Sequence, residues 1–242
     1  MKLDRPIHTV TFDCWETLIF QPNPQAASIR RAETFSQILC ERGHEVSAER
    51  AAVALDAGWQ CHYQTWRRGT SSGAPEIVAF ALEHLDIRDA GLTANAVTAV
   101  QETALGDEVL VLDGARETLE KLAERGIHRA LICDTGFTPG RVVSQLLDRL
   151  DLRNLLQATV FSDEVGVPKP DARMFRAALT ALGSEAAGAV HVGDLRSTDI
   201  AGARAMGMGS IRLRWRHDDT ENLPDGDEVA ESHAHLLEIL SG

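Results

Sequence analysis

The stretch from Ile7 to Phe20 reads Ile-His-Thr-Val-Thr-Phe-Asp-Cys-Trp-Glu-Thr-Leu-Ile-Phe. Its first half is apolar and rich in β-branched residues, which predicts a buried strand over residues 7–12. Asp13 follows this strand at once, before a predicted chain reversal. An aspartate in this place can cap a helix, or it can be catalytic, because open α/β sheets bind ligands at the carboxyl ends of their strands. The rest of the chain decides between these two interpretations.

The composition is that of a soluble globular protein, since 44% of the 242 residues are hydrophobic and 25% are charged. Asp and Glu (36) outnumber Lys and Arg (24), which gives a formal net charge of −12. Nucleic acids and anionic membranes attract basic surfaces, so we expect neither as a partner. A small anionic substrate needs only local positive charge and stays possible. We expect a monomer or a homodimer.

The segment from Met1 to Pro6 has no apolar signal-peptide core, and no run approaches the roughly 20 apolar residues of a membrane span. We therefore expect a cytoplasmic protein. The cysteines have neither CxxC nor Cys/His spacing, which predicts reduced thiols and no zinc site. They are Cys14, Cys40, Cys61 and Cys133.

The hydrophobic period changes twice along the chain. Apolar residues at three- and four-residue spacing predict helices over 26–42, 48–68, 74–85 and 94–105. Later, predicted strands near 128–133, 158–162, 188–193 and 209–215 alternate with helices. Such alternation predicts an α/β fold with a Rossmann-type parallel sheet and helices on both faces. We predict a core domain of residues 1–20 and 107–242 and an inserted helical domain of residues 21–106. The acidic stretch 218–231 is interpreted as a solvated loop.

Polar side chains follow the predicted strands of the core. They are Asp13, Asp134, Thr135, Lys169, Asp194 and Asp199. Parallel strands end at one edge of a sheet, so we expect these groups to share a cleft. Clustered carboxylates repel one another unless a cation lies between them. Mg²⁺, which prefers oxygen ligands, is the expected cofactor.

Four segments resemble the motifs of the haloacid dehalogenase (HAD)-like hydrolase superfamily, in family order. They are residues 12–18 (Phe-Asp-Cys-Trp-Glu-Thr-Leu), 134–136 (Asp-Thr-Gly), 167–171 (Val-Pro-Lys-Pro-Asp) and 192–199 (Val-Gly-Asp-Leu-Arg-Ser-Thr-Asp). The helical insert lies where members carry an α-helical cap. The resemblance implies a HAD-like fold, a cap domain and a hydrolase, with a phosphatase acting on a small phosphorylated metabolite as the leading interpretation.

The resemblance also implies a role for each motif residue. Asp13 would be the nucleophile that forms a covalent aspartyl intermediate. Lys169 would orient Asp13 and neutralise the intermediate, while Asp134 and Thr135 would help to bind the phosphoryl group. The implied Mg²⁺ ligands are Asp13, the backbone carbonyl of Trp15, Asp194 and Asp199.

Two positions depart from the family pattern. Phosphatases of the family carry a general acid two residues after the nucleophile, where this chain has Trp15. Such an acid contributes roughly 10²–10⁴ in rate, so alkyl phosphates should react slowly unless Glu16 or another group replaces it. In the second motif the usual Ser or Thr aligns with Cys133, a poorer donor. Thr135 or backbone amides would then take over this contact.

Trp15 also suggests a metal-independent 2-haloacid dehalogenase, because those members have an aromatic residue at this position. The intact pair of Asp194 and Asp199 argues against it. Arg67 or Arg68 of the insert could bind a substrate carboxylate, although the neighbouring aromatic residues are better interpreted as the packed face of a helix. They are Trp59, Tyr63 and Trp66. A third hypothesis is a catalytically weak binding or regulatory member.

Overall fold

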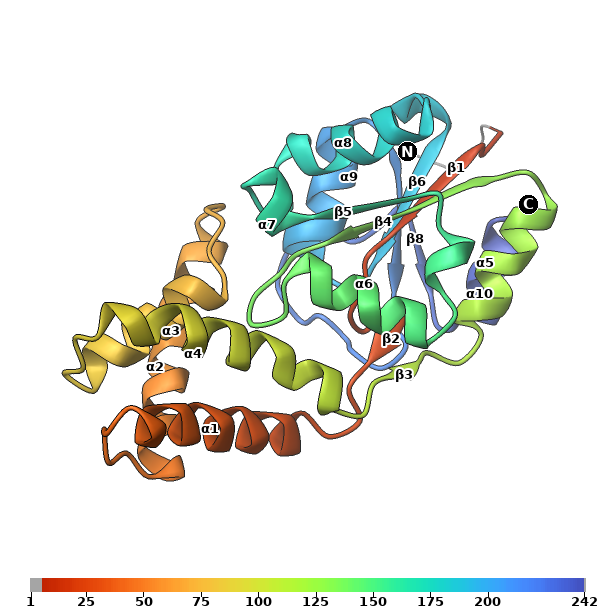
Figure 1. Ribbon diagram of the computed structural model, residues 1–242. Helices are drawn as coiled ribbons and strands as arrows, with labels where there is room; N and C mark the ends of the chain where they lie inside the picture. The colour runs from red at the N-terminus through yellow and green to blue at the C-terminus, as the bar shows by residue number, and fades with distance from the viewer. Residues whose placement is uncertain (1–5, 242) are drawn as a thin grey trace. The chain divides into compact units, whose positions relative to one another are not determined.

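The computed structural model describes residues 6–241 of the chain (Figure 1). The expectation that the segment from Met1 to Pro6 has no signal-peptide core concerns residues 1–5, which lie outside this range. The described chain forms two compact units. The first contains residues 6–20, 109–134 and 147–241, and the second contains residues 21–108 and 135–146. Within 6–241, no helix combines the length and the apolar character that crossing a membrane requires.

The first unit contains a six-stranded sheet in the order β5-β4-β1-β6-β7-β8 (Figure 1). All its neighbouring strands are parallel. The strands are β1 (Thr9–Phe12), β4 (His128–Cys133), β5 (Ala158–Phe161), β6 (Ala189–Gly193), β7 (Gly209–Leu213) and β8 (Glu228–Ala230). Phe12 pairs with Leu131 on one side and with Val192 on the other. Because β1 is covered on both edges and both faces, all four of its residues are buried. The predicted α/β fold is confirmed.

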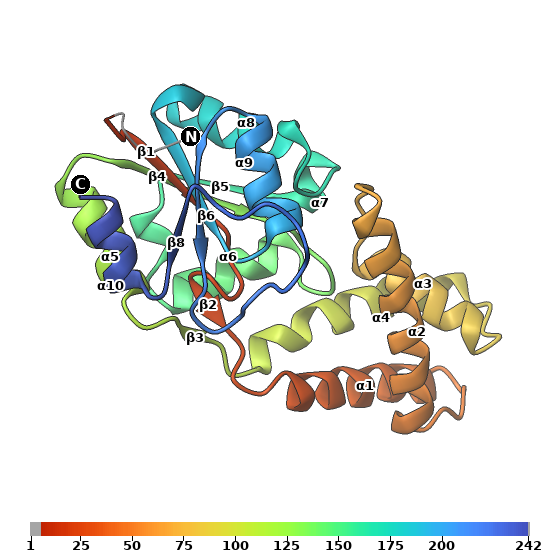
Figure 2. The same ribbon diagram turned by 180° about the vertical axis from the view of Figure 1, so that it is seen from behind.

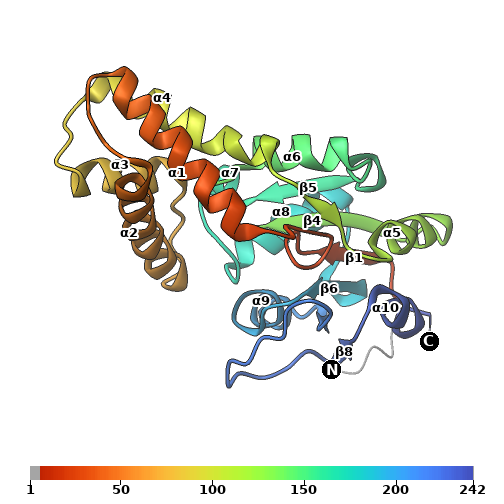
Figure 3. The same cartoon turned by 90° about the horizontal axis from the view of Figure 1, so that it is seen from below.

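Two pairs of helices pack on this sheet, α8 with α9 and α5 with α10. Figures 1 and 3 show the two pairs on opposite sides of the sheet. Their bounds are α5 (Ala115–Glu124), α8 (Ala172–Leu182), α9 (Ala201–Ala205) and α10 (His233–Ile239). The α8–α9 contact depends on Gly202, because a Cβ there would lie 2.2 Å from a ring carbon of Phe175.

Several short elements of this unit were not predicted. A two-stranded antiparallel pair joins β2 (Ile19–Phe20) to β3 (Leu110–Val111), and β8 lies inside the stretch expected to be a loop. The remaining elements are α7 (Ser162–Val165), η2 (Arg153–Leu155), η3 (Ala186–Gly188) and η4 (Arg196–Ile200). The last of these is a π-helical turn that precedes α9. Edge strands of two or three residues give too short a hydrophobic pattern to be recognised.

The second unit is formed mainly by four helices (Figure 2). They are α1 (Pro24–Glu41), α2 (Ala48–Arg67), α3 (Ala74–His84) and α4 (Ala90–Glu102), followed by the 3₁₀ turn η1 (Thr103–Gly106). Asn23, Ser47 and Asp89 cap α1, α2 and α4 by accepting backbone N–H groups. Buried apolar side chains from all four helices form one core. Residues 135–146, which contain the start of α6 (Gly140–Arg149), group with this unit and not with the α/β unit.

Candidate active site

Three adjacent strands of the sheet are each followed by an aspartate. β1 lies between β4 and β6, and the residues after these strands are Asp13, Asp134 and Asp194. Because parallel strands end at the same edge, the three side chains start from one side of the sheet. The backbone N–H of Asp13 donates to the carbonyl of Val192 at 2.8 Å, which extends the sheet by one residue and fixes the Asp13 backbone.

Lys169 connects the acidic residues of this edge. Its Nζ lies 2.5 Å from Oδ1 of Asp13 and 2.7 Å from Oδ1 of Asp199. Its backbone N–H donates to Oδ1 of Asp134 at 2.9 Å. Only 2% of Lys169 is exposed, and an ammonium group is tolerated at such depth only when it is paired. The structure therefore brings three of the predicted site residues, Asp13, Asp134 and Asp199, together around Lys169.

Burial and the neighbouring charges shift the pKa values of Asp13 and Lys169 in opposite directions. Burial raises the pKa of Asp13 well above its ordinary value; Asp199 and Asp194 add to the rise, and Lys169 opposes it. Burial by itself would lower the pKa of Lys169, but the surrounding carboxylates outweigh it and raise that pKa well above the usual value. Lys169 therefore stays an ammonium group at neutral pH and is the positive charge of the site.

The carboxylate of Asp199 is fully hydrogen-bonded. Besides Lys169, its Oδ1 accepts from Nε2 of His191 at 3.0 Å. Its Oδ2 accepts from the backbone N–H of Leu195 at 3.0 Å and lies 3.4 Å from the hydroxyl of Thr198. A carboxylate offers about four lone-pair sites, so these contacts occupy it. Burial would raise the pKa of Asp199, but Lys169 and His191 hold it below the ordinary value. Asp199 is an ionised anchor for Lys169.

His191 holds Asp199 from the interior of the sheet, where it has no exposed surface. Its Nδ1 lies 2.8 Å from the hydroxyl of Thr11, and its Nε2 faces Asp199. Since a carboxylate can only accept, Nε2 carries the proton, and Nδ1 accepts from Thr11. Burial lowers the pKa of His191, which keeps the ring neutral. His191 was not among the site residues predicted from the sequence; its signal was a histidine inside the apolar run of β6.

A second histidine contacts Asp194. Nδ1 of His217 lies 2.6 Å from Oδ2 of Asp194, which is itself 6% exposed. Burial raises the pKa of Asp194, and the hydrogen bond to His217 opposes this rise. The same bond raises the pKa of His217. His217 belongs to the acidic region after β7, which the sequence analysis did not connect with the site.

Two arginines of the α/β unit form ion pairs with aspartates of this acidic region. Arg212, 1% exposed on β7, donates through Nε to Asp225 at 2.6 Å and through Nη1 to Asp218 at 2.9 Å. Arg196 of η4 donates through Nη2 to Asp225 at 3.0 Å and through its backbone N–H to Asp219 at 2.6 Å. The predicted loop is confirmed for residues 218–227, which form no helix or strand, but Asp219 is buried and Asp218 and Asp225 pair with Arg212. An acidic run by itself shows nothing of basic partners elsewhere in the chain.

The residues after Asp13 form a tight turn. Trp15 makes an isolated bridge to Ile19, and Glu16 has a left-handed φ of 57°. The carboxylate of Glu16 lies 3.5 Å from Nε of Arg216, whose guanidinium packs 3.9 Å above the ring of Phe20. Burial raises the pKa of Glu16, and Arg216 opposes the rise. Glu16 therefore has an ionic partner of its own within the α/β unit.

Cys133 and Thr135, the two side chains considered for the contact of the second motif, differ in their surroundings. Cys133 is fully buried, and a hydrogen bond with Cys14 together with burial raises the pKa of its thiol well above the usual value. Its Sγ donates to the carbonyl of Asp134 at 3.3 Å. Thr135 is buried and is the first residue of the segment that groups with the helical unit. Its role in binding a phosphoryl group stays a prediction.

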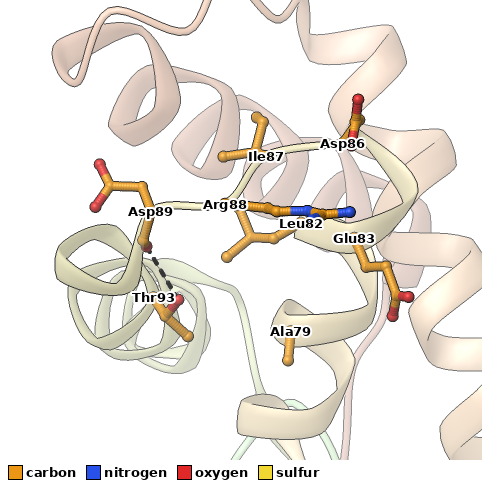
Figure 4. A pocket seen from close by; sticks show the side chains of 8 residues that line it. All are labelled: Ala79, Leu82, Glu83, Asp86, Ile87, Arg88, Asp89 and Thr93. Carbon is orange, nitrogen blue, oxygen red and sulfur yellow. Dashed lines mark hydrogen bonds between the residues drawn. The ribbon is translucent and has the colours of Figure 1, made fainter.

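A pocket of about 730 Å³ lies in the helical unit, between the end of α3 and the start of α4 (Figure 4). Its lining residues are Ala79, Leu82, Glu83, Asp86, Ile87, Arg88, Asp89 and Thr93. The hydroxyl of Thr93 donates to the backbone carbonyl of Asp89 at 3.3 Å, and Asp89 pairs with Arg42 at 3.1 Å. None of the predicted catalytic residues lines this pocket, so we assign the chemistry to the aspartates of the sheet.

Two carboxylates of the site are suited to a magnesium ion. Within residues 6–241, no group of three or more His, Cys, Asp or Glu side chains is arranged to hold a metal. Mg²⁺ needs fewer, because it is commonly held by one or two carboxylates together with phosphate oxygens and water. Asp13 and Asp194 are buried, and Asp194 is close enough to Asp13 to raise the pKa of the Asp13 carboxyl group. These two carboxylates fit the ion, whereas the oxygens of Asp199 are already used.

The family profile of haloacid dehalogenase-like hydrolases matches residues 7–207. The chain therefore belongs to the haloacid dehalogenase-like hydrolase family, as its motifs predicted. It is 31% identical over 211 residues to the ribulose-1,5-bisphosphate 5-phosphatase of Halopiger xanaduensis, and the match covers 84% of this chain and 82% of that relative. It is 30% identical over 176 residues to the phosphoglycolate phosphatase of Pseudomonas syringae pv. syringae, covering 71% and 61%. These relatives support a phosphatase-like hydrolase.

Further matches include a shorter one and two that show the fold alone. Mouse haloacid dehalogenase-like hydrolase domain-containing protein 3 is 34% identical over 133 residues, and the match spans about half of each chain (54% and 51%). The structure of a HAD phosphatase from Thermococcus onnurineus superimposes with a TM-score of 0.68 at 19% identity, covering 98% and 99% of the two chains. A 2-haloacid dehalogenase from Pseudomonas syringae pv. Tomato DC3000 gives 0.67 at 24% identity, covering 97% and 98%.

Proposed function

We propose that this chain is a Mg²⁺-dependent phosphatase that acts on a small phosphorylated metabolite through an aspartyl-phosphate on Asp13. The main support is the contact of one buried lysine, Lys169, with both Asp13 and Asp199. A buried carboxylate that is held by an ammonium group before substrate binds is suited to nucleophilic attack. The phosphatases among its relatives support the same reaction class.

The reaction has two displacement steps. A carboxylate oxygen of Asp13 attacks phosphorus, so that an oxygen–phosphorus bond forms and the bond to the leaving group breaks. Water then attacks the aspartyl-phosphate, which releases phosphate and restores the carboxylate. Lys169 orients Asp13 and offsets the negative charge in both steps. Mg²⁺, held by Asp13, Asp194 and the backbone carbonyl of Trp15, would supply charge neutralisation of the phosphoryl group.

The motif implied that Asp199 is a direct metal ligand, but we assign it a different role. Its lone pairs accept from Lys169, His191 and two groups of the turn that precedes it. Asp199 then acts through Lys169, by fixing the position of the ammonium group. Thr135 and Asp134 remain the proposed phosphoryl-binding residues of the second motif.

The substrate must leave without the usual proton donor. Trp15 has no ionisable group, and Glu16 is paired with Arg216. We therefore favour acyl phosphates or esters whose leaving group is stable as an anion. We also propose that residues 21–106 form a cap domain on a core of residues 1–20 and 107–242. The enzyme would work in the cytoplasm as a monomer or a homodimer.

A panel of alkyl and acyl phosphates, assayed with Mg²⁺ and with EDTA, tests this function. We expect phosphate release that requires Mg²⁺, is fastest with acyl phosphates and is lost in Asp13→Asn. Trapping with a metal fluoride would show a stable complex in the wild type only. Absence of metal-dependent phosphate release, together with an unaffected Asp13→Asn variant, would contradict the proposal.

A second candidate, a metal-independent 2-haloacid dehalogenase, is favoured by the single observation of Trp15 at the position of the missing acid. Asp13 would then displace halide from carbon. Halide release from short 2-haloacids that persists in EDTA and disappears in Asp13→Asn would establish it. If neither panel gives turnover that depends on Asp13, the third hypothesis of a catalytically weak binding member is favoured.

A further inference from the structure

Arg31 occupies a position of α1 where an apolar residue is expected. The buried side chains of this helix include Ala27 and Phe35, which lie four residues before and four residues after Arg31. Residues at this spacing share one face of a helix, so Arg31 lies on the inward stripe. Burial lowers the pKa of its guanidinium. A long charged side chain on such a stripe has a cost, which needs a compensating interaction.

The compensating interactions for the N–H donors of Arg31 are missing in the part of the chain that the structure describes. Its Nε is inaccessible to solvent and has no hydrogen-bond partner. The nearby Asp107 favours the charged form of Arg31, but its carboxylate accepts from Nε of Arg30 at 2.8 Å and from Gln21 at 3.1 Å. Within residues 6–241 no hydrogen bond or ion pair engages the guanidinium of Arg31. A guanidinium has five N–H donors in one plane; Nε of Arg31 is buried without a partner, whereas the side chain as a whole is partly exposed.

The flat face of the guanidinium has a partner. The central carbon of Arg31 lies 4.2 Å from the centroid of the Phe137 ring. That ring stacks on Trp59, with 5.2 Å between centroids and 10° between planes. Gly136 allows this approach, because a Cβ there would lie 2.8 Å from a ring carbon of Trp59. The aromatic stack fixes the orientation of the guanidinium and leaves its edge for another group.

The nearby anionic side chains have other partners: Asp107 pairs with Arg30, and Glu76, which lies near His62, accepts from the backbone N–H of Gly73 at 2.8 Å. His62, which contacts the ring of Trp59, is bonded to the hydroxyl of Ser72 at 2.6 Å. Burial lowers the pKa of His62, so its ring is neutral at physiological pH. An oriented, desolvated guanidinium with unused edge donors matches the geometry of a carboxylate or phosphate group, which accepts two parallel N–H bonds.

We propose that Arg31, oriented by Phe137 and Trp59, is an oxyanion-binding residue of the helical unit that receives a carboxylate or phosphate group of a small ligand. All of its residues belong to the second unit. It goes beyond the phosphatase proposal, because an oxyanion would bind here whether or not Asp13 is phosphorylated.

The test is titration of the full chain, in EDTA, with inorganic phosphate and separately with malonate. The NMR signal of the Arg31 Nε–H group, which is assigned by its loss in Arg31→Gln, reports on the site directly. We expect this signal to move on addition of either anion, and the apparent affinity to fall about tenfold or more in Arg31→Gln. Arg30→Gln is the matched control, because Arg30 already pairs with Asp107. It should leave the titration unchanged, as should Asp13→Asn.

Thermal unfolding distinguishes binding from a structural role. Within residues 6–241 Arg31 has no ion pair or hydrogen bond to lose, and a Met side chain can keep the apolar packing against Phe137, so Arg31→Met should unfold at the same temperature as the wild type or a higher one. Phe137→Leu, which removes the aromatic support, should weaken anion binding. A signal of Arg31 that does not move with either anion would overturn the proposal, as would equal binding by Arg31→Gln or a clearly destabilised Arg31→Met.

Discussion

Nζ of Lys169 lies 2.7 Å from Oδ1 of Asp199, at a depth where 2% and 1% of the two residues are exposed. Removing one partner of a buried ion pair leaves the other charge uncompensated, at a cost of about 3–5 kcal/mol. Lys169→Met should therefore lose activity and also lower the free energy of unfolding in urea at pH 7. The double variant Lys169→Met/Asp199→Asn should recover part of that stability. Wild-type stability of the single variant would contradict this account.

His191 should affect the rate through Asp199 and not through the substrate. His191→Leu removes the hydrogen bond to Asp199, which is worth about 1–3 kcal/mol because the acceptor is charged and buried. We expect kcat to fall roughly tenfold to a hundredfold while KM changes little. His128→Leu, on β4 at the other side of β1, is the control. An equal loss in both variants would point to general destabilisation, which circular dichroism would reveal.

Gly193 sets how closely Asp199 can approach the end of β6. A Cβ at this glycine would lie 2.3 Å from Cγ of Asp199, so Gly193→Ala must displace the carboxylate from Lys169. Because small displacements of catalytic groups are costly, kcat should fall roughly a hundredfold. Gly106→Ala is the control, since the nearest atom to its Cβ would be 3.6 Å away. Full activity in Gly193→Ala would show that the position of Asp199 does not matter.

The sequence was sufficient for those parts of the site that follow strands. Asp13 and Asp194 come directly after apolar runs, so their common edge followed from the topology of parallel sheets. His191 and Arg212 could not be placed in the same way, because they lie inside strands and their partners are set by tertiary packing. A charged residue within a buried strand does signal a hidden partner, but not which residue supplies it. Arg31 illustrates the same limit on a helix.

The acidic region after β7 should make stability dependent on pH. The hydrogen bond from Arg212 is the main cause that holds the pKa of Asp225 below its usual value, and Arg196 adds to it. A depressed folded-state pKa gives stability that is present above the unfolded value of about 3.9 and is lost as pH falls through the folded value. The difference in unfolding free energy between wild type and Asp225→Asn should therefore be fully present at pH 6. It should shrink as the pH falls below the unfolded value of about 3.9 toward pH 2. Urea titrations at several pH values measure it. Asp56→Asn, exposed on α2, controls for the loss of one surface carboxylate.

Trp15 gives the sharpest prediction, because it stands where the family's phosphatases carry their general acid. In Trp15→Asp a carboxyl group two residues after Asp13 could protonate the leaving oxygen and later activate water. We expect kcat for alkyl phosphates to rise by roughly 10²-fold, with a much smaller change for acyl phosphates, whose leaving group needs no proton. Trp15→Asn controls for the loss of the indole ring, and it should leave the alkyl phosphate rate low. Steady-state assays of both substrate types in Mg²⁺ measure the difference. If Trp15→Asp and Trp15→Asn have the same ratio of rates on the two substrates, the missing acid is not what limits this enzyme, and the preference for good leaving groups must be abandoned.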